Sequence, residues 1–273
     1  MDVNGLAERE DGTYTGLKDR QKHRMDSVYL TELFNCVDAT AVDREQFAVV
    51  AVNIMRNMSF NPRNGSFLAE SGHLMKISAE IVLNLKVPVN IRDGIMDMWV
   101  NIAPHMNVGD GFPGHDVLKT CIKLLDPFLD GANFNRFAHT GEILARLAAS
   151  GKRNESAIVD VFEDLLPRLT DMLGGRDSRY VNAGLAALCN CSAFDWTARS
   201  KIARNPRTLA RLVSLLRTPE LAPRAALTLL NLSEAPSNRT MLLVYENNLV
   251  EYASEDSTVS DTVANILYEI ASD

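Results

Sequence analysis

Apolar residues recur along this chain at the spacing that places them on one face of an α-helix. Within residues 47–58 they fall at positions i, i+3, i+4, i+7 and i+11, and residues 95–102 and 263–270 follow a closely related pattern. This periodicity predicts amphipathic helices. Leucine-rich amphipathic segments lie between them, at residues 72–85, 115–129, 161–173 and 207–217. Because no stretch has the alternation and hairpin turns of paired strands, the sequence predicts an all-α fold.

A mostly polar position near the end of the first kind of helix recurs with a nearly constant period. Successive positions are 44, 45, 44, 41 and 38 residues apart: Asn57, Asn101, Arg146, Asn190, Asn231 and Glu269. We call this set the asparagine column. The interval is typical of armadillo or HEAT-type helical repeats, which span about 40 to 47 residues. The sequence therefore predicts an armadillo/HEAT-like right-handed α-solenoid of about five to six repeats, each with a short first helix, a longer second helix and a packed third helix.

The segment LLNLSEAPSNRT, residues 229–240, illustrates a junction between two such repeats. The third helix is expected to end near Ser233, and Pro236 would block its continuation. Ser237 or Asn238 would then cap the next helix by accepting a hydrogen bond from a backbone N–H group.

Residues 1–25 do not follow the repeat pattern. They are polar and charged, with Leu6, Tyr14 and Leu17 as the possible apolar anchors. Such a segment buries too little apolar surface to fold by itself. We therefore expect residues 1–25 to be a flexible leader and residues 26–273 to form the armadillo-type repeat domain.

Composition narrows the classes of ligand. The 273 residues carry a formal net charge of -7, which is the wrong sign for broad contact with phosphates, so we expect no direct nucleic-acid binding. No apolar run is long enough to span a bilayer and the N-terminal residues do not resemble a secretion signal, so we expect an intracellular protein without a membrane partner. The four cysteines lack metal-ligand spacing and are expected to be reduced thiols of the core.

Catalytic motifs are not visible in the sequence. It contains no nucleophile elbow, zinc-protease motif, phosphate-binding loop or dinucleotide fingerprint, and its five histidines are scattered singly. We therefore expect no enzymatic activity, catalytic residue, cofactor or metal ligand. The glycine-rich segment 107–116 is interpreted as a turn-rich connection, although a hydrolase using His115 and Asp116 is an alternative.

The asparagine column and the two tryptophans are the candidate binding residues. An asparagine near a helix end can bond the neighbouring repeat, or it can hold the backbone of an extended peptide, because its amide both donates and accepts. Trp99 lies on an apolar stripe and is expected in the core, whereas Trp196 lies at a repeat junction and is a candidate surface anchor. The predicted protein-binding residues are Asn57, Asn101, Asn190, Trp196 and Asn231.

Residues 200–242, with a leucine-rich second helix, an alanine-rich third helix and the sequence Asn-Leu-Ser, closely resemble an armadillo repeat. Four longer blocks have a more specific resemblance, namely residues 50–74, 94–103, 180–206 and 224–273. Their order and sequence are similar to the C-terminal armadillo-type core-binding region of the large ARID-containing (Osa-family) subunit of SWI/SNF chromatin remodelling complexes. The final block is the most specific, because YENNLVEYA followed by a last helix goes beyond the general repeat pattern.

This resemblance implies a non-enzymatic scaffold subunit in the nucleus that contributes to transcription regulation. The implied partners are SWI/SNF core subunits: the helical segment that precedes the ATPase motor, and the Swi3-like and Snf5-like subunits. The chain departs from the pattern in three places: no ARID fold precedes the repeats, the segment between residues 84–90 and 92–99 is short, and Arg146 replaces the column asparagine. The alternative is an armadillo adaptor that binds extended peptides, as importin alpha and the catenins do.

Overall fold

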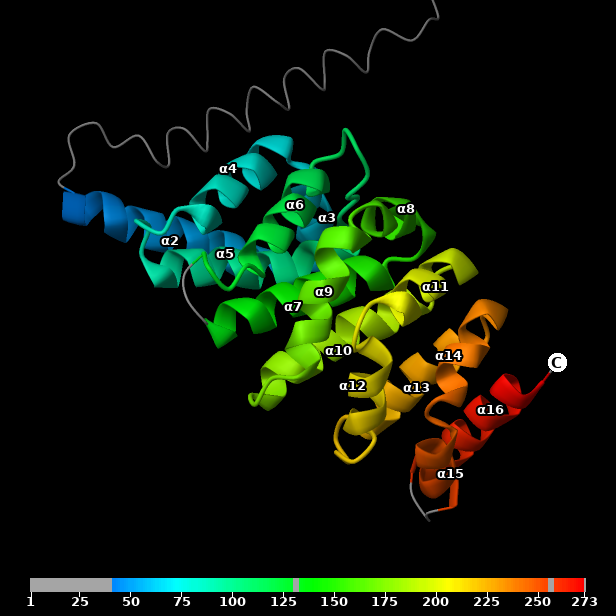
Figure 1. The fold of residues 1–273 in the computed structure, drawn as a ribbon. Coiled ribbons are helices and arrows are strands. Elements are labelled where there is room, and N and C mark those ends of the chain that lie inside the picture. Colours follow the sequence, from blue (N-terminus) through cyan, green and yellow to red (C-terminus); the bar gives the residue numbers. More distant parts are fainter. Residues whose placement is uncertain (1–40, 130–132, 255–257, 273) are drawn as a thin grey trace, which may run out of the picture. The chain divides into compact units, whose positions relative to one another are not determined.

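The computed structural model describes residues 41–129, 133–254 and 258–272 (Figure 1). The chain divides into two compact units, residues 1–51 and 52–273. Of the first unit, the described part is the beginning of one helix, so the account below concerns the second unit. The predicted leader, residues 1–25, and residues 26–40 of the predicted repeat domain lie outside the described residues.

Every regular element in the described ranges is a helix, as the sequence pattern predicted. The third helices of successive repeats are α2 (Ala41–Ser59), α5 (Val89–Ile102), α7 (Phe134–Ala149), α10 (Ser178–Ser192), α13 (Ala222–Ser233) and α16 (Ser260–Ala271). The second helices are α4 (Gly72–Leu83), α6 (Gly114–Leu124), α9 (Phe162–Leu173), α12 (Thr208–Leu215) and α15 (Glu246–Ser254). The first helices are α3 (Pro62–Glu70), α8 (Lys152–Asp160), α11 (Trp196–Arg204) and the pair η2 (Pro236–Asn238) and α14 (Arg239–Leu243).

The third helices pack against one another in chain order. α5 contacts α7, α7 contacts α10, α10 contacts α13, and α13 contacts α16 (Figure 1). Each of them also packs against the second helix of its own repeat. This is the nearest-neighbour packing of an α-solenoid, in which each repeat buries its apolar face against the adjacent repeats. It confirms the predicted armadillo-type fold.

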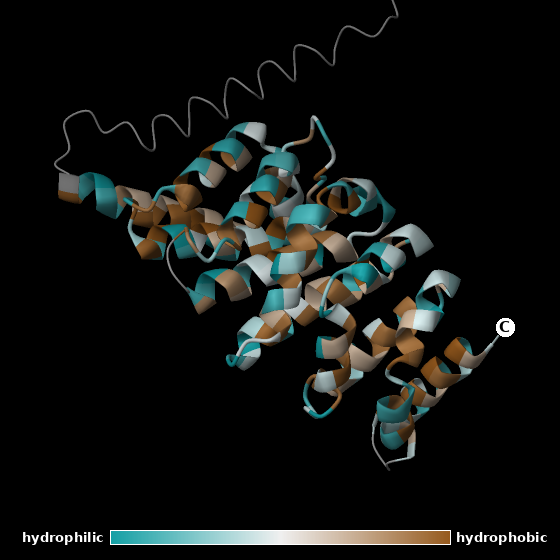
Figure 2. Ribbon diagram, viewed as in Figure 1, coloured by the Kyte–Doolittle hydropathy of each residue, from teal (hydrophilic) through white to brown (hydrophobic). Residues whose placement is uncertain are grey.

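The core consists of the apolar stripes that the periodicity predicted. Hydrophobic and hydrophilic residues alternate along most helices, and hydrophobic residues of these helices form the buried core (Figure 2). Trp99 of α5 is completely buried, as predicted, and its indole N–H donates a hydrogen bond of 3.0 Å to the hydroxyl of Ser78 on α4. That bond satisfies the polar end of the largest buried side chain. Cys121, Cys189 and Cys191 are free and buried, whereas Cys36 lies outside the described residues.

The junction after α13 confirms the predicted break but not the predicted cap. α13 ends at Ser233 and η2 begins at Pro236, yet neither η2 nor α14 has a side-chain cap. Asn238 is completely buried and its Nδ2 donates to the backbone oxygens of Leu232 (2.9 Å) and Arg199 (3.2 Å). The capping prediction was therefore wrong, because this amide bonds two backbone oxygens at the repeat boundary and does not accept from the next helix.

The repeat that contains α6 and α7 departs from the predicted three-helix pattern. Where a first helix was expected, the chain has the short 3-10 helix η1 (Ala103–His105) and then turns through to Pro113. Asn154 of α8 holds these turns, because its Oδ1 accepts from the Val108 N–H (3.1 Å) and its Nδ2 donates to the Met106 oxygen (3.2 Å). The turn-rich connection predicted for residues 107–116 is confirmed for residues 107–113, whereas residues 114–116 are the start of α6. A side chain from the next repeat supports these turns in place of the missing helix.

Candidate functional site

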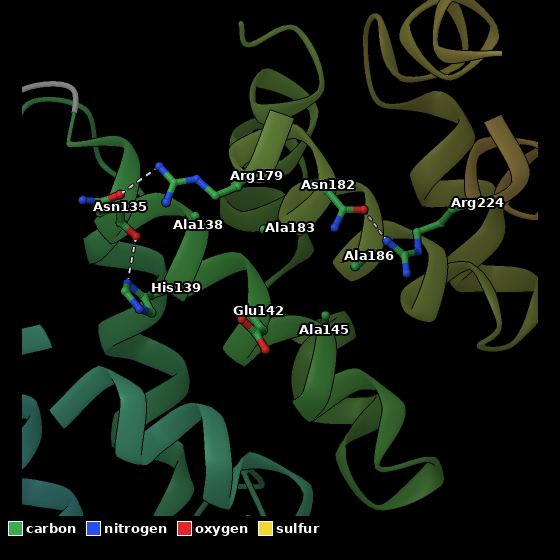
Figure 3. Close-up of a pocket in the computed structure, with 10 residues that line it drawn as sticks. All are labelled: Asn135, Ala138, His139, Glu142, Ala145, Arg179, Asn182, Ala183, Ala186 and Arg224. Carbon is green, nitrogen blue, oxygen red and sulfur yellow. Dashed lines mark hydrogen bonds between the residues drawn. The ribbon is translucent and has the colours of Figure 1, made fainter. Parts of the chain in front are cut away.

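A hollow of about 460 Å³ lies on the face formed by the third helices α7, α10 and α13 (Figure 3). Four alanines line it, Ala138 and Ala145 from α7 and Ala183 and Ala186 from α10. Since an alanine side chain ends at Cβ, these positions leave room between the helices that longer side chains would fill. The other lining residues are polar or charged: Asn135, His139, Glu142, Arg179, Asn182 and Arg224. We call this site the third-helix hollow.

Two arginines of the hollow reach from one third helix to the preceding one. The Arg179 guanidinium on α10 donates to Oδ1 of Asn135 on α7 over 3.4 Å, and the Arg224 guanidinium on α13 donates to Oδ1 of Asn182 on α10 (Figure 3). The same kind of contact therefore recurs one repeat apart, separated by 44 residues in the first case and 42 in the second. Both acceptors are neutral amide oxygens, so these contacts do not neutralise the arginine charges.

Glu142, also in the hollow, is paired within its own helix. Its Oε1 accepts hydrogen bonds from Nη2 and Nε of Arg146, at 2.8 and 3.2 Å. The pair has the i, i+4 spacing that brings opposite charges together on a helix surface. Arg146 is the residue that replaces asparagine in the column, so the repeat that lacks the column amide carries an ion pair at its surface instead.

The side of the hollow toward α5 contains charges of both signs. Nε2 of His139 lies 3.1 Å from Oδ1 of Asp97, and the other oxygen of Asp97 lies 3.4 Å from Nη1 of Arg56. Burial raises the pKa of the neighbouring Asp93 carboxyl above its usual value, while the charges of His139 and Arg92 oppose the rise. The carboxylates on α5 are therefore accompanied by cations, whereas Arg179 and Arg224 on α10 and α13 bond neutral amide oxygens.

A second hollow of about 580 Å³ lies where α7 and α10 end and the next first helices begin. It is lined by Ala148, Ala149, Gly151, Lys152, Glu155, Asn190, Ala193, Phe194 and Asp195. Oε1 of Glu155 accepts from the backbone N–H of Asp195 at 2.9 Å, which joins α8 to the start of α11. Asn190, one of the predicted site residues, lines this hollow.

Three members of the asparagine column bond the preceding repeat. Nδ2 of Asn101 donates to the Ser59 hydroxyl (2.9 Å), and Nδ2 of Asn231 donates to the Ser192 hydroxyl (3.0 Å). Nδ2 of Asn190 donates to the backbone oxygen of Ala145 (2.7 Å). These three side chains are half-buried, which places them in the repeat-to-repeat packing that was one of the two interpretations of the column.

The other two predicted binding residues lie at the surface. Asn57 is exposed near the end of α2, and Trp196 is 68% exposed at the first position of α11. Asn57, Trp196 and the other column asparagines are not among the residues that line the third-helix hollow. A role in protein binding stays a prediction for all five.

The hollow itself was missed by the sequence analysis. Its floor consists of alanines, and periodicity alone assigns alanines on a third helix to the packed side. The signal that was present is the run of polar residues on α7, at Asn135, His139, Glu142 and Arg146, which recur at the three- or four-residue spacing of one exposed helix face. That run marks the exposed side of the row of third helices.

Two other findings limit the chemistry of the described residues. No cluster of three or more histidine, cysteine, aspartate or glutamate side chains in this part of the chain is placed to hold a metal ion. Within the same residues, no helix combines the length and the apolarity that crossing a membrane requires.

No protein-family model matches the chain. Two curated plant proteins, each named Armadillo repeat-containing protein LFR, are similar to it. The protein of Arabidopsis thaliana is 27% identical over 276 residues, covering 93% of this chain and 58% of the relative. The protein of Oryza sativa subsp. japonica is 27% identical over 252 residues, covering 87% of this chain and 54% of the relative. The chain thus spans a little more than half the length of these relatives.

Solved structures of designed armadillo repeat proteins share the fold. One has a TM-score of 0.70 with 16% sequence identity, covering 89% of this chain and 98% of the design. Another, solved in complex with the peptide (KR)4, has a TM-score of 0.69 with 15% identity, covering 88% of this chain and 99% of the design. Together with the stacked third helices, these likenesses show that the chain has the armadillo-repeat fold.

Proposed function

We propose that this chain is a non-enzymatic scaffold subunit of a SWI/SNF-type chromatin remodelling complex in the nucleus, and that its third-helix face binds segments of partner subunits. The observation that carries the binding role is the hollow of about 460 Å³ on three consecutive third helices. A row of stacked repeats exposes a long, regular surface, which suits contact with a partner segment over several repeats. Its alanine floor leaves space for the main chain of that segment.

The chemistry of the hollow favours binding over catalysis. His139 is paired with Asp97, which is the arrangement that orients a general base. The lining residues, however, include no serine, threonine or cysteine that this histidine could activate as a nucleophile. The hydrolase alternative at the glycine-rich turns has weaker support, because the His115 ring Nδ1 lies 3.1 Å from the backbone oxygen of Val108 and its Nε2 lies 3.6 Å from Asp110. These contacts are typical of a histidine that helps to hold a turn.

Support for the SWI/SNF assignment comes from the four sequence blocks that resemble the Osa-family subunit, at residues 50–74, 94–103, 180–206 and 224–273. The proposed partners are the helical segment that precedes the ATPase motor and the Swi3-like and Snf5-like subunits. The armadillo-repeat fold is consistent with this assignment, because its work would be assembly of the core. We propose no direct contact of this chain with nucleic acid.

A second candidate function is that of an adaptor for extended peptides. One designed relative of the same fold was solved with a bound peptide, which favours this mode of binding for the fold. In this chain, the Nδ2 atoms of Asn101, Asn190 and Asn231 already donate to the preceding repeat. Each amide has a second N–H and an oxygen, so peptide binding by these residues would use the remaining groups.

Affinity purification of the full chain from nuclear extract at moderate salt, followed by crosslinking and mass spectrometry, tests the proposal. We expect recovery of a remodeller ATPase with its core subunits, with crosslinks on the third helices. The matched variants are Ala138→Gln with Ala186→Gln, which fill the hollow with neutral, helix-compatible side chains, and Ala210→Gln at an exposed position of α12. The first should reduce recovery and the second should not.

Recovery of cargo-like peptides or cytoskeletal proteins in place of remodeller subunits would contradict the SWI/SNF assignment and favour the adaptor. Full recovery with the hollow filled, and with a systematic series of surface substitutions on the other third helices, would contradict binding by this face.

A further inference from the structure

The third-helix hollow contains positive charge that is not neutralised within its own lining. Arg179 and Arg224 both direct their guanidinium groups to amide oxygens, and the single glutamate of the lining, Glu142, is bonded to Arg146. Arg179 also lies 3.6 Å from Asp177, but that carboxylate accepts two backbone N–H groups at the start of α10. Since the whole chain has a net charge of -7, two such arginines on one alanine-floored hollow are a local exception to its acidic character.

The geometry of the two arginines matches an extended polypeptide better than a compact ligand. Each guanidinium spans two adjacent third helices, and the second contact repeats the first one helix further along the row (Figure 3). Neighbouring packed helices lie roughly 8–10 Å apart. An extended chain advances about 3.3 Å per residue, so side chains two or three residues apart would meet the two arginines.

We infer that the third-helix hollow binds an extended segment of a partner protein whose acidic side chains pair with Arg179 and Arg224. This inference rests on the proposed function and names the chemistry of the segment. The guanidinium groups retain N–H donors beyond those bound to Asn135 and Asn182, and a carboxylate is their best-matched acceptor. The alanine floor, at Ala183 and Ala186 among others, accommodates the main chain between the two pairs.

The existing pairs indicate where the acidic residues of the segment lie. Toward α5, His139 and Arg56 are already paired with Asp97. Arg179 and Arg224 bond neutral amide oxygens, so the acidic residues of the segment lie over α10 and α13. The net charge of -7 on the whole chain disfavours a nucleic-acid strand, whose phosphates would extend beyond the two arginines.

Fluorescence anisotropy with the purified full chain tests the inference. Three short labelled peptides serve as probes, with glutamate, glutamine or lysine alternating with serine. The variants are Arg179→Gln, Arg224→Gln and both together. The control is Lys201→Gln with Arg204→Gln, two exposed residues of α11 outside the hollow, which changes the net charge by the same amount as the double variant. Thermal unfolding of each variant establishes that it is folded.

The glutamate peptide should bind the wild type more tightly than the other two peptides, and the difference should decrease as salt is raised. Each arginine substitution should weaken its binding roughly three- to ten-fold, and the α11 control should change it little. Equal affinity for the glutamate and glutamine peptides, or unchanged binding by the double variant, would overturn the inference. Tighter binding of a single-stranded oligonucleotide at the same arginines would also overturn it.

Failure of this inference is distinguishable from failure of the proposed function. If the lysine peptide binds the hollow best, the face still binds peptides and only the acidic preference is wrong. If none of the peptides binds, the inference fails, while recovery of remodeller subunits from nuclear extract still decides the scaffold proposal independently.

Discussion

The side-chain amide of Asn231 on α13 donates a hydrogen bond of 3.0 Å to the hydroxyl of Ser192 on α10, 39 residues earlier in the chain. Ser192 is the third residue of an Asn-Cys-Ser motif, and Asn231 is the first residue of the next motif, Asn-Leu-Ser. Asn101 bonds Ser59 of Asn-Met-Ser in the same way. The serine of an Asn-x-Ser motif therefore joins successive repeats by accepting a hydrogen bond from the column asparagine of the next repeat.

The exception follows from the same rule. The repeat whose last helix is α7 has Arg146 and Ala148 at the positions where the motif has asparagine and serine. With no hydroxyl to accept its hydrogen bond, Asn190 donates to the backbone oxygen of Ala145. Motifs of this kind would be glycosylation acceptors in a secreted protein, but here their serines, such as Ser192 and Ser233, are buried and bond the last turn of their own helix.

The Asn231–Ser192 hydrogen bond should contribute measurably to stability. Asn231→Ala should lower the free energy of unfolding by about 1 kcal/mol, because the buried hydroxyl loses its donor but keeps its own bond to the Cys189 oxygen. Ser192→Ala should have an effect of similar size. Urea unfolding of both single variants and the double variant measures the coupling, which we expect to be about 0.5 kcal/mol or more. Additive effects, or an equal effect of Asn247→Ala on the exposed side of α15, would contradict a specific bond.

Asn154 should be among the most sensitive polar positions of the chain. Its side chain is completely buried and makes three hydrogen bonds, to Val108, Met106 and Leu147. Asn154→Ala would leave the buried backbone groups of Val108 and Met106 without this partner, so we expect a loss of about 3 kcal/mol in the free energy of unfolding. Asn154→Asp should destabilise further, because a carboxylate would face the oxygens of Met106 and Leu147. Lys152→Ala, an exposed change in the same helix, is the control, and a similarly small effect at both positions would contradict the role given to Asn154.

The sequence predicted the fold because solenoid packing repeats. Each third helix meets its neighbours with the same face, so the apolar stripe and the column position recur with the repeat and can be aligned without a structure. The predictions failed where the repeats differ. The turns before Pro113 depend on Asn154, 46 residues from Val108, and Asn238 bonds Arg199, 39 residues away. Periodicity within one helix carries no information on such contacts. The third-helix hollow forms because alanines of α7 and alanines of α10 lie next to one another. The sequence analysis missed it because the periodicity of one helix does not show which residues of another helix lie beside it.

Two buried thiols should resist alkylation in the folded chain. Burial raises the pKa of Cys121 to about 12, and that of Cys191 also to about 12. The thiolate is the reactive form, so at pH 8 both thiols are almost entirely protonated as well as shielded from the reagent. Mass spectrometry after iodoacetamide treatment should find both residues unmodified in the native protein and modified in urea. Rapid native labelling of either residue, at the rate seen in urea, would contradict their burial.

Asp177 should make the stability of α10 depend on pH. Its carboxylate accepts from the backbone N–H groups of Tyr180 and Arg179 at the start of the helix, and the Tyr180 bond is the main cause that lowers its pKa below the usual value of 3.8. Because the pKa of Asp177 is lower in the folded chain than in the unfolded chain, this carboxylate adds stability above its unfolded pKa. That contribution is lost as the pH falls through the folded pKa.

The variant Asp177→Asn tests this pH dependence, because it keeps a side-chain oxygen as the cap but cannot titrate. The melting temperature of the wild type should therefore exceed that of the variant at pH 7, and the difference should shrink as the pH is lowered through 4 toward 3. A constant difference over this range would show that the charge of Asp177 does not contribute. Asp177→Ala removes the cap as well, and should be the least stable of the three proteins at pH 7.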